Sequence, residues 1–256
     1  MRILAVAIIS FVLVACGGEA EQAQRHDLEV VTDGSALESV ETDEGYQVEV
    51  ESVTLRVRSV EFTAGGEAHA SRGLERIAAL LIRRAHAHPN HQAGGEVVGE
   101  LPGPLLLTWR PGQSEVAGTG RFLEAEYQGY NLEFSGDPID EDDPLEEGLM
   151  ARIEGSFDDG GGEVPFVADI EATDTAQIFG GVLRGNIPDD VDTAVALKLL
   201  TEDDWTEATL FDGVRFSQVD LDEAGVAQID IDSEPVAHGM IRIALREHGF
   251  YDGKLQ

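Results

Sequence analysis

Residues 46–57 read YQVEVESVTLRV, and this stretch decides the fold class. Every second residue from Tyr46 to Val50 is apolar, and after Ser52 the alternation resumes in the opposite phase as far as Val57. A period of two is typical of a strand with one buried face, because successive side chains of a strand point to opposite sides. The stretch therefore predicts β-structure, and the change of phase at Ser52 predicts a bulge or a turn.

Further segments of the same kind follow, separated by clusters of Gly, Pro and Asp. They lie at 104–109, 121–134, 149–157, 164–172, 177–185, 193–200, 213–219 and 226–231. Helical spacing of apolar residues predicts a helix from about Leu74 to Arg84, and a capping-box-like start at Thr201 predicts a second one through Ala208. Residues 236–248 are compatible with helix or strand.

Many strands and few helices favour a sheet-on-sheet architecture. We therefore expect a mainly β protein, an antiparallel β-sandwich with one to three short helices. No internal repeat and no second linker is visible after Tyr46, so residues 45–256 are predicted to form a single domain.

The N-terminus carries a targeting signal. Residues 3–14 are apolar apart from Ser10, which is too short to span a bilayer but suits the central part of a secretory signal. Leu13-Val14-Ala15-Cys16 resembles the lipobox of bacterial lipoproteins, in which the Cys is lipidated and becomes the mature N-terminus. This resemblance implies a signal peptide at 1–15, lipidation at Cys16 and a membrane partner through the lipid anchor.

Residues 16–44 are polar and acidic without sustained periodicity, so we expect a lipidated N-terminus followed by a flexible tether. In bacterial lipoproteins an Asp after the Cys retains the protein at the inner membrane. Because Gly17 stands at this position, the resemblance implies the bacterial cell envelope, with the outer membrane favoured over the inner.

The overall composition excludes several classes of protein. The chain has 17 Lys and Arg against 50 Asp and Glu, a formal net charge of −33, which argues against nucleic acid as a partner because phosphate binding needs basic patches. Cys16 is the single Cys, so a disulfide framework, a Cys-based zinc site and an iron–sulfur cluster are excluded.

Three of the seven His lie within six residues, at His86, His88 and His91. In an extended backbone, which Pro89 favours for the residue before it, the first two imidazoles lie on one face. A Pro-Asn turn can bring His91 back over them. Three neutral imidazoles on so short a segment predict a site for a transition metal, although a solvent-exposed polar turn would have the same sequence.

The available ligand atoms restrict the metal. Beyond Met1 the chain has only Met150 and Met240, so a soft Cu(I) site is not expected, and Zn²⁺, Cu²⁺ or Ni²⁺ remain. A carboxylate or a remote His would complete the shell, and the lower-grade candidates are His69, His248 and Glu96.

The His segment, AHAHPNH at 85–91, followed by GGE at 94–96 and GEL at 99–101, is similar to a group of proteobacterial envelope proteins that carry a His-Ala-His-Pro-Gly-His stretch after two strands. The resemblance covers about Val53 to Phe134. Asn90 stands where that group has Gly, and it tolerates the same turn. The resemblance supports the His motif and implies no enzymatic activity.

Acidic loops offer a second type of site. Ca²⁺ binds six to eight oxygens, and Asp-x-Asp spacing in a loop supplies them. The candidate ligands are Asp220, Asp222, Asp230 and Asp232. The first pair begins like an EF-hand loop but departs from it at Ala224 and Ile231, and solvated turn residues explain most such clusters.

Sequence signatures of enzymes are absent: there is no His-Glu-x-x-His, Gly-x-Ser-x-Gly, Walker or dinucleotide-binding motif. We therefore expect a lipid-anchored envelope protein that is not an enzyme and that binds Zn or Cu for buffering or delivery to an envelope partner. The alternative is a structural or adhesive envelope lipoprotein whose acidic loops bind Ca²⁺ or a partner protein.

Overall fold

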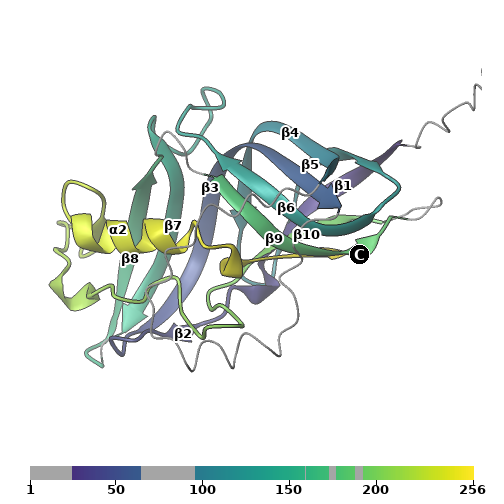
Figure 1. Cartoon of the computed structure of the whole chain (residues 1–256). Coiled ribbons are helices and arrows are strands. Elements are labelled where there is room, and N and C mark those ends of the chain that lie inside the picture. The colour runs from purple at the N-terminus through teal and green to yellow at the C-terminus, as the bar shows by residue number, and fades with distance from the viewer. Residues whose placement is uncertain (1–24, 65–95, 159, 173–176, 188–192) are drawn as a thin grey trace, which may run out of the picture.

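The computed structural model describes residues 25–64, 96–158, 160–172, 177–187 and 193–256 (Figure 1). The predicted signal peptide, Cys16 and the predicted helix at 74–84 lie outside the described residues. So do four of the candidate metal ligands, which are His69, His86, His88 and His91.

The strand β3 (Gln47–Ala64) organises the molecule, and it contains the alternating stretch that predicted the fold class. Its first half pairs with β7 (Leu149–Asp158) and its second half with β6 (Glu126–Phe134), while β4 (Glu96–Trp109) pairs along its other edge. The register of β3 against β7 shifts between Val50 and Ser52, so the predicted change of phase is a bulge.

Eight strands close into a barrel. The ring runs through β3, β4, β5 (Ser114–Leu123), β1 (Arg25–Asp33), β10 (Val195–Leu199), β12 (Tyr251–Leu255), β9 (Gln177–Asn186), β6 and back to β3. The mainly β class is thus confirmed, but the antiparallel sandwich is wrong. Two of the pairings inside the ring, β1 with β10 and β9 with β12, are parallel. They join strands far apart in sequence, which local alternation does not reveal.

The rest of the sheet extends from β3 beyond the barrel (Figure 1). It continues from β7 to β8 (Glu163–Glu171) and the short β11 (Ala227–Ile229), and β2 (Val40–Glu41) pairs with the first residues of β3. The helix α2 (Pro235–Ala244) packs on β8 and β11, so the ambiguous segment at 236–248 begins as helix. Three 3-10 helices complete the described elements: η1 (Gly34–Ala36), η2 (Phe216–Gln218) and η3 (His248–Phe250).

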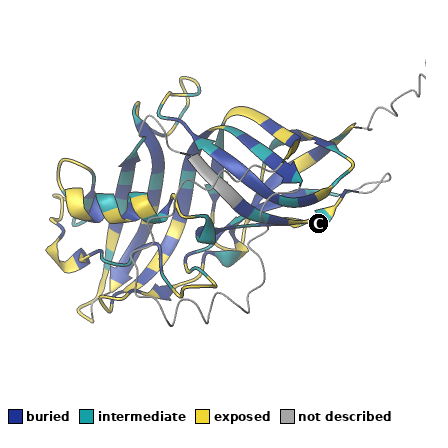
Figure 2. Cartoon of the chain, viewed as in Figure 1, coloured by how far each residue is buried: buried dark blue, intermediate teal, exposed yellow. Residues whose placement is uncertain are grey.

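Side chains fill the inside of the barrel, as the buried positions along its strands show (Figure 2). Phe62 lies against Phe122 with ring centroids 4.7 Å apart, and Tyr127 and Tyr130 extend this aromatic cluster. The Trp109 indole donates to the Leu197 carbonyl at 2.8 Å, which satisfies its buried N–H. The barrel is therefore a packed core.

A second aromatic cluster lies under the extension of the sheet. The Phe157 and Phe216 rings stack at 4.6 Å, and Tyr46, Phe166 and Phe211 pack around them. Phe216 reaches this cluster from η2, so the predicted strand at 213–219 is wrong. Its apolar residues are buried from a turn and a 3-10 helix, and burial alone does not distinguish these from a strand.

Two other sequence predictions are also wrong. The predicted helix at 201–208 is a set of turns, because Asp203 accepts the Trp205 N–H and the Thr206 hydroxyl in place of helical bonds. The predicted tether over 16–44 is wrong for residues 25–44, because β1 and β2 belong to the sheet. The domain therefore begins at Arg25 in the described chain.

Candidate functional site at one end of the barrel

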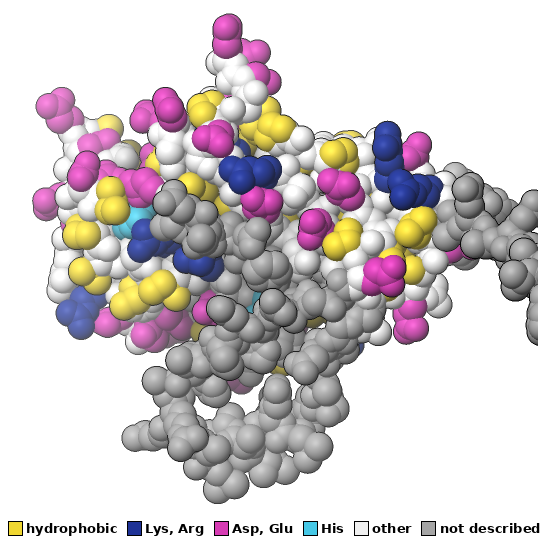
Figure 3. All heavy atoms as spheres, turned by 45° about the horizontal axis from the view of Figure 1, so that its top comes forward, with side chains coloured by type: hydrophobic (Ala, Val, Ile, Leu, Met, Phe, Trp, Pro, Cys, Tyr) yellow, Lys and Arg dark blue, Asp and Glu magenta, His cyan; other side chains and the backbone are white. Residues whose placement is uncertain are grey.

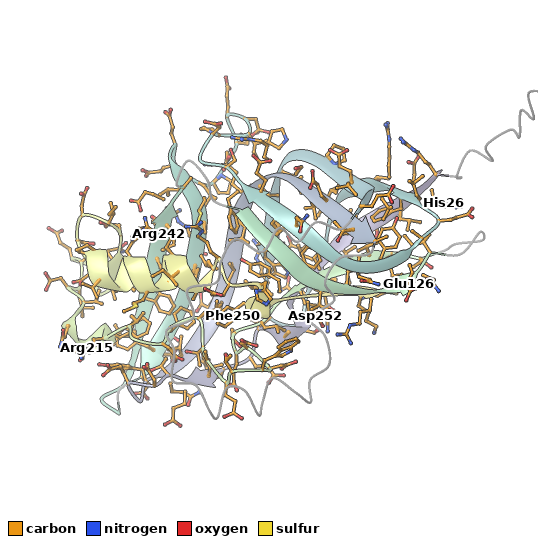
Figure 4. All side chains as sticks on the ribbon, viewed as in Figure 1. His26, Glu126, Arg215, Arg242, Phe250 and Asp252 are labelled. Atoms are coloured by element: carbon orange, nitrogen blue, oxygen red, sulfur yellow. The ribbon has the colours of Figure 1, made fainter. Side chains whose placement is uncertain are left out.

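Several separate segments of the chain meet at one end of the barrel. Arg25 begins β1 and pairs with Leu123 at the end of β5, while Ala64 ends β3 and pairs with Glu96 at the start of β4. Strand β6 begins here at Glu126, and strand β9 ends here at Asn186. We call this region the Arg25 end. Figure 4 labels His26 and Glu126 there, and Figure 1 marks the C-terminus nearby.

The Arg25 end is held by buried hydrogen bonds. The Tyr127 hydroxyl lies 2.7 Å from the Leu123 carbonyl and 2.9 Å from the Val98 carbonyl, so it connects the end of β5 to the start of β4. Burial raises the pKa of Tyr127 to about 12, so the hydroxyl keeps its proton and remains a donor at neutral pH. The strands at this end therefore form a fixed platform.

A nitrogen and oxygen donor pair lies on this platform. His26 Nε2 is 3.3 Å from Glu124 Oε1, and the two side chains are 12% and 35% exposed. Imidazole and carboxylate are ligands that borderline metals such as Zn²⁺ accept. Within the described ranges no group of three or more His, Cys, Asp or Glu side chains could hold a metal ion. His26 and Glu124 by themselves are thus an incomplete ligand set.

The two additional candidate metal ligands that the structure describes, Glu96 and His248, lie apart from each other. Glu96 is exposed and is the first residue of β4, so it belongs to the Arg25 end. His248 belongs to η3, which directly precedes β12. Tyr251, the first residue of β12, pairs with Leu199, the last residue of β10, which lies away from the Arg25 end. The structure therefore does not bring His248 and Glu96 together.

Two of the four acidic residues considered for Ca²⁺, Asp222 and Asp230, accept hydrogen bonds within turns. Asp222 Oδ1 accepts the N–H groups of Ala224 and Val226 at 2.8 and 2.9 Å, and Asp230 Oδ1 accepts those of Asp232 and Ser233 at 2.9 and 2.8 Å.

These backbone hydrogen bonds hold the pKa of both Asp222 and Asp230 below the ordinary value. Asp220 and Asp232 are exposed. Asx turns account for this spacing, because a short carboxylate readily caps the N–H groups two or more residues later.

Sequence reasoning missed two contacts between ionisable side chains in which at least one partner is buried. The first joins Arg56 and Asp143, both nearly inaccessible, with Nε donating to Oδ2 at 2.8 Å. Burial alone would raise the pKa of Asp143, but hydrogen bonds from Arg56, Ile139 and Leu145 outweigh it and hold the pKa below the ordinary value. The pair fixes the acidic loop at 136–149. Arg56 lies in the polar phase of β3, between Thr54 and Arg58, so the sequence pattern predicted an exposed side chain and gave no signal of the buried pair.

The second pair joins His238 of α2 to Glu171 at the end of β8. His238 Nε2 contacts Glu171 Oε2 and lies 3.4 Å from the Glu171 backbone N, and the imidazole is 1% exposed. Burial lowers the pKa of His238, and Arg242 adds to this lowering while Glu171 and Asp230 oppose it. Because α2 was not distinguished from a strand, no sequence signal placed His238 in the core.

Comparisons with known proteins add no family to these observations: no protein-family profile, no curated protein and no solved structure matches the chain. None of the helices in the described part of the chain is both long and apolar enough to cross a bilayer.

Proposed function

We propose that this chain is a lipid-anchored protein of the bacterial envelope that binds a transition metal ion through the His segment between β3 and β4, for buffering or delivery to a partner. His86, His88 and His91 are the proposed ligands, and His69 is a further candidate on the same segment. The lipid attachment is proposed at Cys16. The outer membrane is the favoured location, because Gly17 follows this Cys.

One observation carries the proposal. The two residues that flank the His segment in the described chain, Ala64 and Glu96, are paired with each other at the Arg25 end. The segment therefore leaves and rejoins the body where the chain from Cys16 enters it. Nine residue steps from Cys16 to Arg25 span at most about 31 Å, so the proposed metal site would lie close to the membrane surface.

The donor chemistry of the Arg25 end supports the same proposal. His26 and Glu124 offer a nitrogen and an oxygen to a metal, and Glu96 adds an exposed carboxylate at the same end. A metal held by imidazoles would need them neutral, so binding would weaken as the pH falls through about 6.5.

The test uses a chain beginning at Gly17, so that lipidation plays no part. Elemental analysis after dialysis and calorimetric titration are expected to give about one Zn²⁺ or Cu²⁺ per chain, since three imidazoles and one further donor fill a four-coordinate site. Replacing His86, His88 and His91 together by Ala is expected to abolish tight binding. The matched control, His248→Ala, removes an imidazole from η3, away from the Arg25 end, and is expected to bind as the wild type does.

Two outcomes would refute the proposal. Equal metal uptake by the wild type and the triple variant would show that the His segment is a polar turn. Loss of binding in His248→Ala alone would place the metal elsewhere. The alternative, a structural or adhesive envelope lipoprotein with Ca²⁺-binding or partner-binding loops, would then remain.

The lipid anchor has its own test. In a bacterial host, the wild-type precursor is expected to incorporate labelled palmitate and to partition into the detergent phase, and Cys16→Ser is expected to do neither. Label retained by the Ser variant would rule out the lipobox interpretation.

A further inference from the structure

The outward face of α2 is apolar and uncovered in the structure. Val236, Met240 and Ile243 are 69%, 41% and 59% exposed. Their spacing of four and three residues places them along one face of the helix. The opposite face buries Ala237 and Ile241, so α2 is already fixed on the sheet and presents a second apolar face outward.

The helix itself carries no acidic residue, unlike most of the chain. No Asp or Glu occurs between Glu234 and Glu247, although the chain as a whole carries a net charge of −33. Arg242 and Arg246 lie in and just after the last turn of the helix. On the left of the molecule in Figure 3, hydrophobic and basic side chains lie together with Asp and Glu side chains around them, and Figure 4 labels Arg242 on α2.

A second copy of the chain fits this face poorly. A two-fold contact through α2 would bury the same three apolar side chains on each copy. Three partly exposed side chains supply far less than the roughly 800 Å² per partner of a standard protein interface.

A phospholipid surface fits it better. The helix is attached to the sheet by its inner face and projects outward, so the binding groove of a partner protein cannot enclose it. A fluid bilayer can adapt to a projecting helix. Amphipathic helices that lie in a membrane interface combine an apolar face with flanking Arg or Lys, which pair with lipid phosphates. At physiological salt, repulsion between the acidic body and anionic lipid decays over about 8 Å, so the apolar and basic side chains of α2 can still approach the lipid.

We propose that the α2 patch, formed by Val236, Met240, Ile243, Arg242 and Arg246, docks on a phospholipid surface. The three apolar side chains enter the boundary between headgroups and acyl chains, and the two guanidinium groups bind phosphates. This docking is independent of the metal site, and its test does not use the proposed anchor at Cys16.

The chain offers a clean way to measure this docking. A protein that begins at Gly17 contains no Cys, because Cys16 is the only one in the sequence. Ile243→Cys therefore gives a single position for a polarity-sensitive fluorophore. Val116→Cys on β5 is the matched control, since Val116 is 64% exposed, as an apolar residue of the barrel surface.

With vesicles of phosphatidylethanolamine and phosphatidylglycerol in 0.15 M salt, emission from position 243 is expected to shift to the blue, and emission from position 116 is not. In flotation of the unlabelled protein, Arg242→Gln with Arg246→Gln is expected to weaken partitioning by roughly thirtyfold, because each phosphate-binding Arg contributes about fivefold. Circular dichroism of each variant checks that the fold is retained.

Three results would overturn the proposal. The first is an unchanged emission at position 243 at saturating lipid. The second is an equal shift at positions 243 and 116, which would mean non-specific adsorption. The third is a shift without lipid that grows with protein concentration, which would assign the patch to a second copy of the chain.

Discussion

Arg56 shows how much a single buried side chain can determine in this protein. It is fully buried, donates to the Asp143 carboxylate, and donates through its other nitrogens to the carbonyls of Gly136, Leu145 and Leu149 at 3.0, 2.5 and 2.6 Å. A pair so completely hydrogen-bonded is costly to break because the remaining partner stays buried without a counter-charge.

We therefore expect Arg56→Met to lower the free energy of unfolding by about 3–5 kcal/mol, measured by urea denaturation at pH 7. The control is Arg58→Met, which removes an Arg that is 55% exposed and pairs with Glu133 at the surface. That change is expected to cost less than about 1 kcal/mol. Equal effects of the two substitutions would show that the buried pair does not hold the loop.

His238 is expected to make the stability of the protein depend on pH. Its pKa in the folded protein is lowered chiefly by burial, so as the pH falls below about 6.5 the unfolded chain takes up the proton before the folded one does. The contribution of the neutral imidazole is thus complete above about pH 6.5 and is lost as the pH falls below it. We expect the urea midpoint of His238→Gln to fall less steeply between pH 7 and pH 5.5 than that of the wild type.

The matched control is His248→Gln, which removes an imidazole from η3 and leaves the contact between α2 and Glu171 in place. It is expected to keep the wild-type slope. A wild-type slope in His238→Gln would mean that other groups cause the pH dependence.

At the scale of elements, β1 closes the barrel between β5 and β10. A chain that begins at Arg25 is expected to fold, whereas one that begins at Tyr46 lacks β1 and β2 and leaves the edges of β5 and β10 unpaired. Open edges promote aggregation because they present free N–H and C=O groups. Size-exclusion chromatography and circular dichroism of both chains test this, and a monomeric, strand-rich chain from Tyr46 would contradict it.

The strands that the sequence predicts best are those whose pattern is set by local burial. The alternation from Tyr46 to Val57 predicted both a strand and its bulge, because the side chains of β3 alternate between core and solvent. Closure of the ring was not predictable, since it depends on β1 meeting β10 about 160 residues later, and no local pattern records that contact.

For the candidate sites, too, the local sequence pattern did not show the contacts that the residues make. Asp222 and Asp230 have the spacing of a Ca²⁺ loop and also that of an Asx turn, and the turn hydrogen bonds become visible only in the structure. Glu171 and His238 lie 67 positions apart, so their pairing follows from the packing of α2 on β8 and from no sequence motif.

At the scale of the whole molecule, the net charge of −33 opposes compactness, because like charges repel across the surface. Added salt screens this repulsion. We expect the melting temperature of the chain from Gly17 to rise between 10 mM and 500 mM NaCl, as measured by circular dichroism, with most of the rise at low salt, where the screening length shortens fastest.

The same protein distinguishes general screening from specific Ca²⁺ binding. If the acidic loops are only turns, Ca²⁺ and Mg²⁺ at equal concentration are expected to raise the melting temperature equally, because both screen charge and neither finds a built site. Stabilisation by Ca²⁺ beyond that by Mg²⁺ would favour the Ca²⁺-binding alternative, because a ligand that binds the folded state adds stability by mass action. Asp222→Ala would then remove the excess if that loop holds the ion, whereas screening by the rest of the surface would persist.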